Sequence, residues 1–238
     1  MNISIIIPTL NEADYLASTI ECLRQSSSSD NEIIVIDSGS TDLTCEIAGK
    51  LGVKFLNYQG NTLGKAHVLN EAAEFASGDV FLFVDADTLV PAEFDKSIAA
   101  VMADQGVVGG AFEFSLDGPE FGLRVVELIN RTRYRVRQRF YGDQGIFVRA
   151  EVFKRVGGYP EIPLFETAHL CKNLRKCGKL KLIKKNIKTS PRRFLGGGIY
   201  RVLWGDIKLW FLDLIGMSVD KYAGPYWKEN ELRSKDKI

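Results

Sequence analysis

Short apolar runs alternate with helical patterns over the first ninety residues of the chain. The runs cover residues 3–7, 33–36, 53–56 and 80–84. They are too continuous for strands with one solvent-exposed face, which is typical of parallel strands buried on both faces. Between them, apolar residues recur every three or four positions, the period of an amphipathic helix. The alternation predicts an α/β fold, in which helices cover both faces of an open, mainly parallel, twisted sheet with right-handed crossovers.

The pattern is less regular after residue 90. We expect helices over 94–103, 150–156 and 166–177, strands over 109–116, 145–148 and 180–183, and an irregular or helical stretch over 123–140. Residues 199–217 are apolar and aromatic but interrupted by charges. They predict a helix packed on the domain, with an interfacial membrane helix as the alternative. We expect one domain over 1–195 and a helical extension with a charged, frayed tail over 196–238.

Composition mainly indicates the compartment. A chain of 238 residues with 45% hydrophobic content can bury a full core. The first nine residues lack a basic leader and a cleavage site, and the four cysteines have no zinc or redox spacing. We therefore expect reduced thiols and a cytoplasmic protein.

The two halves of the chain carry opposite charge. Residues 1–120 hold 19 Asp and Glu against 5 Lys and Arg, whereas residues 121–238 hold 11 against 26. The acidic half suits a cation, and the basic half suits phosphates, an acidic substrate or an anionic membrane surface, although ordinary solvated surfaces would give the same counts. The arginines within residues 131–139 match no nucleic-acid-binding motif. We expect no nucleic acid partner, and peripheral contact with the inner membrane face stays open.

Polar residues follow three of the four predicted strands, at 8–12, 37–42 and 85–87. Each set alone is weak evidence, because Asp and Asn also occur in turns and at helix N-termini. In an open parallel sheet, however, ligands bind beyond the carboxyl ends of the strands, where neighbouring crossovers diverge. Together the three sets predict a binding site at this edge.

Two phosphate-binding patterns are excluded. Residues 8–14 contain no glycine, so the first strand leads into no dinucleotide-binding turn. Residues 60–66, Gly-Asn-Thr-Leu-Gly-Lys-Ala, have one residue too few between the glycines of a P-loop and no Ser or Thr after the lysine.

Asp85 and Asp87 come directly after the buried run 80–84. Such a pair can hold a hard divalent cation on a diphosphate, because these cations prefer oxygen ligands. The same residues with Thr88 also resemble the nucleophile strand of haloacid-dehalogenase-type phosphatases. Those enzymes need a downstream acidic pair, and the only candidate, Gly142-Asp143, is followed at the required spacing by Phe147. The phosphatase is therefore the weaker hypothesis, and the pair favours a nucleotide diphosphate.

Four motifs resemble those of family-2 glycosyltransferases with the GT-A fold: SIIIPTLNEADYL at 4–16, VIDSGSTDLT at 35–44, GDVFLFVDADT at 78–88 and GIFVRAEVFKRVGGYPEIPLFE at 145–166. The resemblance covers about the first 195 residues, and residues GGAF, YGDQG and TSPRRF are most similar to a bacterial branch of arsenosugar-type biosynthesis. It implies a nucleotide-binding half over 1–90 and an acceptor half over 91–195.

The resemblance also implies the donor site. Thr9, Glu12 and Asp37 would hold the nucleoside, and Asp37 would contact its nucleobase. Asp85 would lie near the ribose, and Asp87 would ligate Mn²⁺ or Mg²⁺ on the diphosphate. For Glu12, a charge favourable in the first turn of a helix is nearly as good an interpretation.

Arg192 and Arg193 are candidates for the diphosphate, whose developing charge a guanidinium could stabilise by bidentate contacts. The family implies one displacement with inversion at the anomeric carbon, in which a general base takes the acceptor hydroxyl proton. No Gln-X-X-Arg-Trp signature of processive enzymes is present, so we expect transfer of one sugar.

The expected catalytic base is missing. The family usually has Glu-Asp where this chain has Glu166-Thr167, and a threonine accepts no proton near neutral pH. Glu166 is our candidate base, with His169 as an alternative; the two would share a helix face and could pair with each other. Asp143 and Gln144 are candidates for holding the acceptor. If none acts as base, the chain would be a non-catalytic nucleotide-sugar-binding protein.

Overall fold

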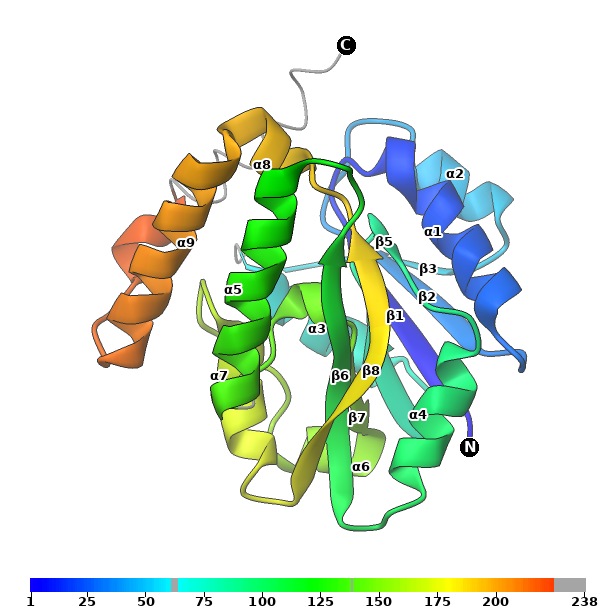
Figure 1. Ribbon diagram of the computed structural model, residues 1–238. Coiled ribbons are helices and arrows are strands. Elements are labelled where there is room, and N and C mark those ends of the chain that lie inside the picture. The colour runs from blue at the N-terminus through cyan, green and yellow to red at the C-terminus, as the bar shows by residue number, and fades with distance from the viewer. Residues whose placement is uncertain (61–63, 138, 225–238) are drawn as a thin grey trace.

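The computed structural model describes residues 1–60, 64–137 and 139–224, and within them eight strands form one sheet in the order β3-β2-β1-β4-β7-β6-β8-β5 (Figure 1). The strands are β1 (Ile3–Thr9), β2 (Glu32–Asp37), β3 (Lys54–Asn57), β4 (Val80–Phe83), β5 (Thr88–Leu89), β6 (Val107–Leu116), β7 (Ile146–Arg149) and β8 (Lys179–Thr189). The helices are α1 (Ala13–Ser26), α2 (Thr44–Lys50), α3 (Lys65–Glu74), α4 (Phe94–Met102), α5 (Phe121–Arg137), α6 (Ala150–Arg155), α7 (Glu166–Leu174), α8 (Arg192–Gly197) and α9 (Ile199–Leu214), with a 3₁₀ turn, η1 (Gly142–Gln144).

The sheet is parallel where the sequence alternates regularly. Neighbouring strands among β3, β2, β1 and β4 pair in parallel. β7 then pairs antiparallel to both β4 and β6, β8 runs parallel to β6, and β5 closes the edge antiparallel to β8. The predicted α/β class is confirmed, but the sheet is mixed, and each antiparallel pairing involves β7 or β8.

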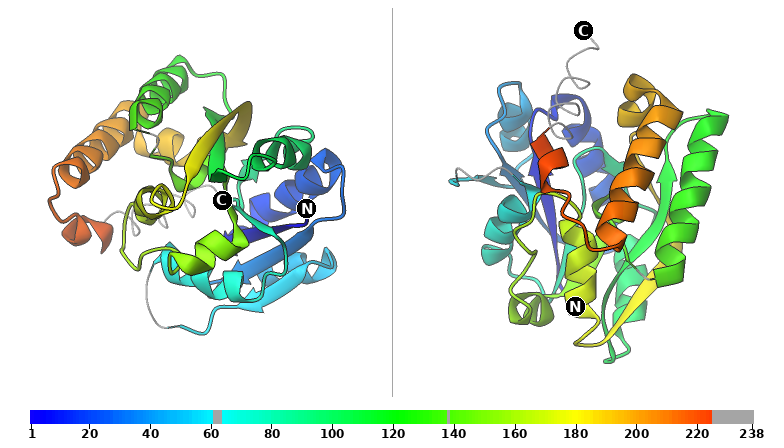
Figure 2. Two further views of the ribbon diagram at one scale, coloured as in Figure 1. Left: turned by 90° about the horizontal axis from the view of Figure 1, so that it is seen from below. Right: turned by 90° about the vertical axis from the view of Figure 1, so that its left-hand side faces the viewer.

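Helices cover both faces of the sheet, as the two views of Figure 2 show. Successive residues of a strand point to opposite faces. In β1, Ile5 and Ile7 therefore pack in the cluster with α1, α2 and α4, whereas Ile6 packs in the cluster with α3, α5, α6 and α7. These runs are buried on both sides, which explains why they lack a polar alternation.

Of the two forms expected for 123–140, irregular or helical, the structure has mainly one helix, α5, so its arginines spread around the helix instead of lining one face. Two strands differ from the sequence-based expectations. β8 continues to Thr189, beyond the predicted end at 183, and the two-residue strand β5 was not predicted. The Lys-rich residues after 183 are typical of a solvated segment, but β6 supplies their pairing partner from a distant part of the chain.

The C-terminal helices share the main core. Phe194 of α8 and Val202 and Leu203 of α9 belong to the same buried cluster as β4 and α5. The predicted boundary at residue 195 lies inside α8, and the division of 1–195 into two halves stays a prediction. Among the described residues, no helix is long and apolar enough to cross a bilayer. The predicted frayed tail from Lys228 lies outside the described residues.

Candidate functional site

The polar residues that follow β1, β2 and β4 meet at one edge of the sheet. β1 pairs with β2 on one side and with β4 on the other, so the crossovers diverge next to β1, where an open α/β sheet binds its ligands. After Thr9, Asn11 adopts the left-handed conformation (φ 56°) that Asn tolerates, and it turns the chain into α1. The sequence-based expectation that these strand ends converge agrees with the structure.

Asp37 is held by donors from its own loop and from β1. Its carboxylate accepts hydrogen bonds from Thr9 Oγ1 at 3.0 Å, from the backbone amides of Gly39 and Ser40 at 2.9 and 2.7 Å, and from Ser40 Oγ at 2.5 Å. Donors on both carboxylate oxygens fix the orientation of Asp37. Thr9 and Asp37 thus form the floor of the edge as a pair, and their predicted contact with the nucleoside stays a prediction.

Arg192 joins Asp87 to Glu12. Its Nε lies 3.2 Å from Asp87 Oδ2, its Nη2 lies 2.5 Å from Glu12 Oε1, and its guanidinium carbon lies 4.7 Å from the centre of the Tyr15 ring. β8 brings Arg192 here, because Thr189 at its end pairs with Thr88 of β5, directly after Asp87. One guanidinium thereby connects two carboxylates that are 75 positions apart in the sequence.

Burial changes the proton affinity of both carboxylates. Burial raises the pKa of Glu12 from 4.5 to about 7, against the lowering effect of Arg192, and the charges of Asp87 and Asp85 raise it further. Burial likewise raises the pKa of Asp87, against the charge of Arg192. Within the described part of the chain, Glu12 Oε2 is buried without a hydrogen-bond partner. Buried carboxylates with unused oxygens are typical of ligand sites, since an unpaired buried oxygen is costly.

Lys65 is a site residue that the sequence analysis missed. It begins α3, and its ammonium forms a salt bridge with Asp85. Burial acts against the charge of Lys65, but the nearby carboxylates of Asp85 and Glu166 raise its pKa. Residues 60–66 do not match a P-loop, so the sequence pattern assigns no phosphate-binding role to this lysine. Its position one residue after the second glycine, at a predicted helix start, was the available signal.

Glu166 lies close enough to Lys65 and Asp85 for their charges to act on it. It is 9% exposed, and Oε1 accepts a hydrogen bond from Thr167 Oγ1 at 3.2 Å. Burial raises the pKa of Glu166, and the charge of Lys65 opposes this. A Cβ added at Gly142 would lie 3.3, 3.5 and 4.0 Å from Lys65 Nζ, Thr167 Oγ1 and Glu166 Oε1. Gly142 therefore leaves a space against which an ammonium, a hydroxyl and a carboxylate converge.

The backbone before Glu166 is strained. Phe165 adopts the left-handed conformation (φ 62°), which is unusual for a bulky residue and costs about 1–3 kcal/mol. Its ring packs edge-on against Tyr141, with centroids 6.2 Å apart. This conformation makes Glu166 the first residue of α7. Strained residues of this kind cluster at functional sites, where the surrounding packing maintains them.

Asp143 and Gln144 share η1 but have different surroundings. Among the described residues, the Asp143 carboxylate has no hydrogen-bond or ion-pair partner, and burial raises its pKa to about 6, against the charge of Arg133. Gln144 is 1% exposed; its Oε1 accepts from Tyr141 N and its Nε2 donates to Phe112 O. Asp143 is available to a ligand, whereas the Gln144 amide holds the turn to β6.

Two predicted residues make their main contacts outside this group. His169 Nε2 lies 2.8 Å from Asp213 Oδ1 of α9, so its predicted pairing with Glu166 is wrong. The reason is that α9 packs against that side of α7. Arg193 forms a two-pronged ion pair with Asp206 of α9. Its charge still lowers the pKa of Asp143, but Arg192 alone of the two arginines contacts the predicted donor carboxylates.

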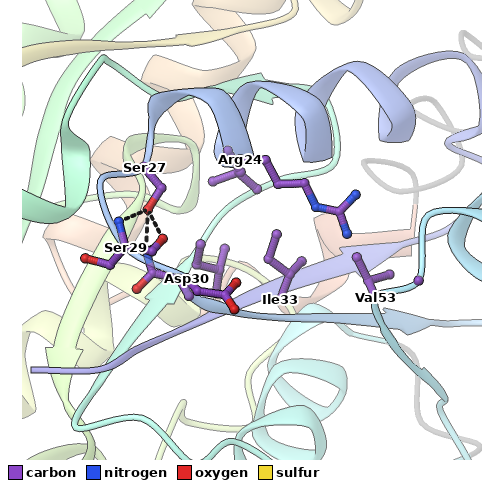
Figure 3. A pocket seen from close by; sticks show the side chains of 10 residues that line it. Arg24, Ser27, Ser29, Asp30, Ile33 and Val53 are labelled. Atoms are coloured by element: carbon purple, nitrogen blue, oxygen red, sulfur yellow. Dashed lines mark hydrogen bonds between the residues drawn. The ribbon is translucent and has the colours of Figure 1, made fainter.

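A cavity of about 320 Å³ lies at the other end of the sheet, where α1 ends and β2 begins (Figure 3). Arg24, Ser27, Asp30 and Val53 line it, and Ser27 forms hydrogen bonds with its neighbours there. None of the predicted site residues belongs to its described lining. Its position at the amino ends of the strands separates it from the carboxylate cluster.

The acidic edge fits a divalent cation that a ligand completes. Among the described residues, no group of three or more His, Cys, Asp or Glu side chains is arranged to hold a metal. Mg²⁺ and similar cations at diphosphate sites usually take one or two carboxylates and fill their shell with phosphate oxygens and water. Asp87 and Asp85 offer that number of hard oxygen ligands, while Arg192 and Lys65 balance the charge.

Comparison with known families gives a match over most of the fold. The model of the family described as glycosyl transferase family 2 matches residues 4–155. This range contains β1 to β4, η1 and β7, and therefore the ends that carry Thr9, Asp37, Asp85 and Asp87. Glu166 and Arg192 lie beyond it.

Curated relatives are assorted glycosyltransferases. The chain is 26% identical to glycosyltransferase AglE of Haloferax volcanii over 233 residues, which cover 90% of this chain and 76% of AglE. It is 32% identical to a PGL/p-HBAD biosynthesis glycosyltransferase of Mycobacterium bovis BCG over 106 residues, which cover 42% of this chain and only 41% of that protein.

Solved structures at low identity share the fold. Mannosyltransferase PcManGT of Pyrobaculum calidifontis, in complex with GDP-Man and Mn²⁺, has a TM-score of 0.66 at 21% identity, covering 98% of this chain and 69% of that one. Glucosyl-3-phosphoglycerate synthase of Mycobacterium tuberculosis, with Mn²⁺, UDP and glucosyl-3-phosphoglycerate, has a TM-score of 0.64 at 20% identity, covering 91% and 81%. The architecture is that of GT-A glycosyltransferases.

Proposed function

The chain belongs to glycosyl transferase family 2, and we propose that it moves one sugar from a nucleotide-diphospho-sugar to an acceptor hydroxyl, with inversion at the anomeric carbon. The observation that carries this proposal is the cluster of Asp85, Asp87, Glu12, Arg192 and Lys65 at the diverging crossovers beside β1. The family match favours glycosyl transfer over the phosphatase hypothesis.

Within this proposal, the strand ends bind the donor. Thr9, Glu12 and Asp37 hold the nucleoside, and Asp85 lies near the ribose. Asp87 holds a divalent cation, Mn²⁺ or Mg²⁺, which when bound polarises the diphosphate and lowers the energy of its departure. Mn²⁺ in the glucosyl-3-phosphoglycerate synthase and PcManGT complexes supports Mn²⁺ as the first candidate.

Arg192 changes partners in the proposed donor complex. In the present structure its guanidinium neutralises Asp87 and Glu12. A diphosphate in the same place offers several anionic oxygens. The planar guanidinium of Arg192 can donate two parallel hydrogen bonds to them, which the ammonium of a lysine cannot match in geometry. Arg192 thus stabilises charge on the leaving group, and Arg193, held by Asp206, contributes from a greater distance.

Glu166 is the proposed general base. The acceptor oxygen attacks the anomeric carbon, its proton passes to a Glu166 carboxylate oxygen, and the nucleoside diphosphate departs from the opposite face. Burial raises the pKa of Glu166, the direction that makes a carboxylate a stronger base, and the charge of Lys65 opposes this. Thr167 donates its hydroxyl to Glu166 instead of acting on the substrate. Asp143, without a protein partner among the described residues, holds the acceptor.

The narrower features of the function are also proposals. The donor nucleobase and sugar are open, because the relatives are assorted, and membership of the arsenosugar-type branch rests on the short segments GGAF, YGDQG and TSPRRF. The four free cysteines of the structure agree with a cytoplasmic location, where thiols stay reduced. Any contact with the inner membrane face would be peripheral.

A thermal-shift panel of nucleoside diphosphates with and without Mn²⁺ tests donor binding. A ligand that binds only the folded protein stabilises it by about 2.7 kcal/mol at a concentration of 100 Kd. We expect at least one nucleoside diphosphate to raise the melting temperature, and to raise it more with Mn²⁺ than without. No shift for any base, in either condition, would contradict the proposed donor site.

A non-catalytic nucleotide-sugar-binding protein is the second candidate function, and Thr167 at the usual position of the base favours it. It predicts the same thermal shifts but no turnover. Release of nucleoside diphosphate in the presence of acceptor extracts, lost in Glu166→Gln, would exclude this candidate.

A further inference from the structure

Helix α9 has its acidic residues on the inside. It lies on the outer flank of the molecule beside α5, and the right-hand view of Figure 2 looks directly onto it. Asp206 accepts from both terminal nitrogens of Arg193, and Asp213 pairs with Arg139 and lies 2.8 Å from His169 Nε2. These are the two acidic residues of α9, so its negative charge is turned toward the protein.

Large apolar side chains occupy the outward face of the same helix. Tyr200, Trp204, Phe211 and Ile215 are 55%, 69%, 54% and 53% exposed. They are four, seven and four positions apart, which places them on one line along a helix. Lys208, also exposed, stands within this line between Trp204 and Phe211. We refer to these five residues as the outer stripe. Trp210, which the sequence alone could not separate from Trp204, is half-buried and outside it.

Helix α5 carries a similar exposed line next to α9. The two helices touch near their starts, where a Cβ at Gly122 would lie 3.0 Å from Ile199 Cδ1. Phe121 and Leu128 of α5 are 77% and 66% exposed; the side chains of Arg124 and Arg135 on the same face are 46% and 54% exposed and form ion pairs with Glu127 and Glu113. This flank therefore combines exposed aromatic and aliphatic groups with exposed cations.

A continuous exposed apolar patch usually marks an interaction site. We propose that the outer stripe, with the exposed line of α5, docks onto an anionic lipid bilayer. Trp and Tyr suit the bilayer interface because their rings are apolar and their N–H and O–H groups are polar. Lys208, which forms no ion pair with a described residue, complements anionic headgroups.

Charge favours the bilayer over a second copy of the chain. Two outer stripes packed against each other would bring the Lys208 side chains of both copies together, and the acids of α9, Asp206 and Asp213, are already engaged with Arg193 and Arg139. The wider composition agrees, because residues 121–238 hold 26 Lys and Arg against 11 Asp and Glu. The docking is peripheral, because α9 keeps its inner face, Val202 and Leu203, in the protein core.

Co-sedimentation of the full chain with vesicles tests the proposal. The vesicles contain phosphatidylcholine alone or phosphatidylcholine with phosphatidylglycerol. We expect binding to the anionic vesicles that weakens as salt rises. The double variant Trp204→Ser/Phe211→Ser removes two apolar anchors, and Lys208→Glu changes the stripe by two charges. Each should weaken binding by roughly tenfold or more.

Phe75→Ser is the matched control. Phe75 is 50% exposed, like Phe211, but lies at the end of α3, where its carbonyl accepts a hydrogen bond from Lys54 of β3 at the far edge of the sheet. It should leave vesicle binding unchanged, and circular dichroism checks that every variant folds. Nucleotide thermal shifts should be the same in all of them, which separates this proposal from the proposed chemistry.

Three results would overturn the proposal. Wild type could fail to bind anionic vesicles at low salt, or Phe75→Ser could weaken binding as much as the stripe variants. Alternatively, light scattering could show a dimer that the stripe variants dissociate while vesicles bind nothing. That last result would assign the outer stripe to a second copy of the chain.

Discussion

The strand-end residues of the donor side and the side chains that meet them are positioned in different ways. On the donor side, Thr9, Asp37, Asp85 and Asp87 lie at or directly after the ends of buried parallel strands, so the pairing of β1 with β2 and β4 brings them together. The side chains that meet them, Arg192, Glu166 and Lys65, arrive from the start of α8 after β8, the start of α7 and the start of α3. Local rules fix the first set, whereas long-range packing fixes the second.

This difference has an energetic side. Asp37 has four donors from the protein, and most come from its own loop, so its orientation is fixed without a ligand. Among the described residues, Glu12 Oε2 and the Asp143 carboxylate have no hydrogen-bond partner, and Phe165 is strained. Unused binding capacity therefore lies at Glu12 and Asp143, where the strand ends meet segments from elsewhere in the chain.

The largest effect should come from Glu166, one of the residues that distant segments bring to the site. In Glu166→Gln we expect the rate of sugar transfer to fall by about 10²–10⁴-fold, because a positioned general base contributes about that much. Nucleotide binding should persist, since Glu166 forms no ion pair or hydrogen bond with Asp85, Asp87 or Arg192 among the described residues. The check is turnover beside the nucleotide-induced thermal shift. Unchanged turnover would move the base to Asp143 or elsewhere.

The wild-type pH profile adds a second readout of the same residue. Burial raises the pKa of Glu166, and a base works only when deprotonated. Activity should therefore rise with pH through a midpoint above 4.5, the ordinary value for glutamate. A rate that is flat from acid to neutral pH would argue against a buried carboxylate as base.

On the donor side, Asp87→Asn should lower activity by about 10²–10³-fold, because charge stabilisation of the leaving group by a cation is worth several kcal/mol. In contrast to Glu166→Gln, it should abolish the difference between thermal shifts measured with and without Mn²⁺. Asp87→Asn also removes one of the two carboxylates that pair with Arg192. Asp85→Asn leaves both of them in place and is therefore the comparison variant. An Mn²⁺ effect that survives in Asp87→Asn would contradict the assignment.

Thr167→Asp sharpens the comparison, because it restores the acidic residue usual in the family. With Glu166 as the base, a second carboxylate at 167 is buried beside it, and like charges raise its pKa. We expect activity at neutral pH to fall by about tenfold and the pH profile to move upward. Activity several times higher than that of wild type would instead show that this position is better suited to the base.

The smallest effect concerns the stability of the donor side. The pKa of Glu12 is about 7 in the folded protein and 4.5 ordinarily, so the folded state binds more protons between these values. Stability is then fully present below about pH 4.5 and falls as pH rises through 7, by about 1–3 kcal/mol. In Glu12→Gln this decline should be reduced, as melting temperatures at pH 5 and pH 8 would show. An unchanged decline would assign it to another group.

Sequence patterns predict most of the first half, because each inference there depends on neighbours in the chain. The apolar runs define β1 to β4, and the carboxyl ends of parallel strands must share an edge, so the place of Asp85 and Asp87 follows. The same logic does not reach Lys65. Its value lies in a salt bridge to Asp85, 20 positions later, and the motif that contained it failed the test for a P-loop.

The second half depends on tertiary contacts that local patterns do not encode. The sequence of β8 is rich in Lys, which is typical of a solvated segment. Its pairing with β6 and β5 nevertheless places Arg192 next to Glu12, 180 positions earlier in the chain. His169 has the spacing to pair with Glu166, but α9 supplies Asp213 instead. Trp204 and Trp210 look equivalent in the sequence, and only the packing of α9 shows which one faces outward.

The most direct test is a crystal structure with a nucleoside diphosphate and Mn²⁺, using the anomalous signal of manganese to locate the ion. We expect one anomalous peak within about 2.3 Å of an Asp87 carboxylate oxygen, at an ion that also contacts the diphosphate. Arg192 should have turned from Glu12 toward the phosphates. An ion bound away from Asp87, or a nucleotide lodged outside the edge formed by β1, β2 and β4, would contradict the proposed donor site.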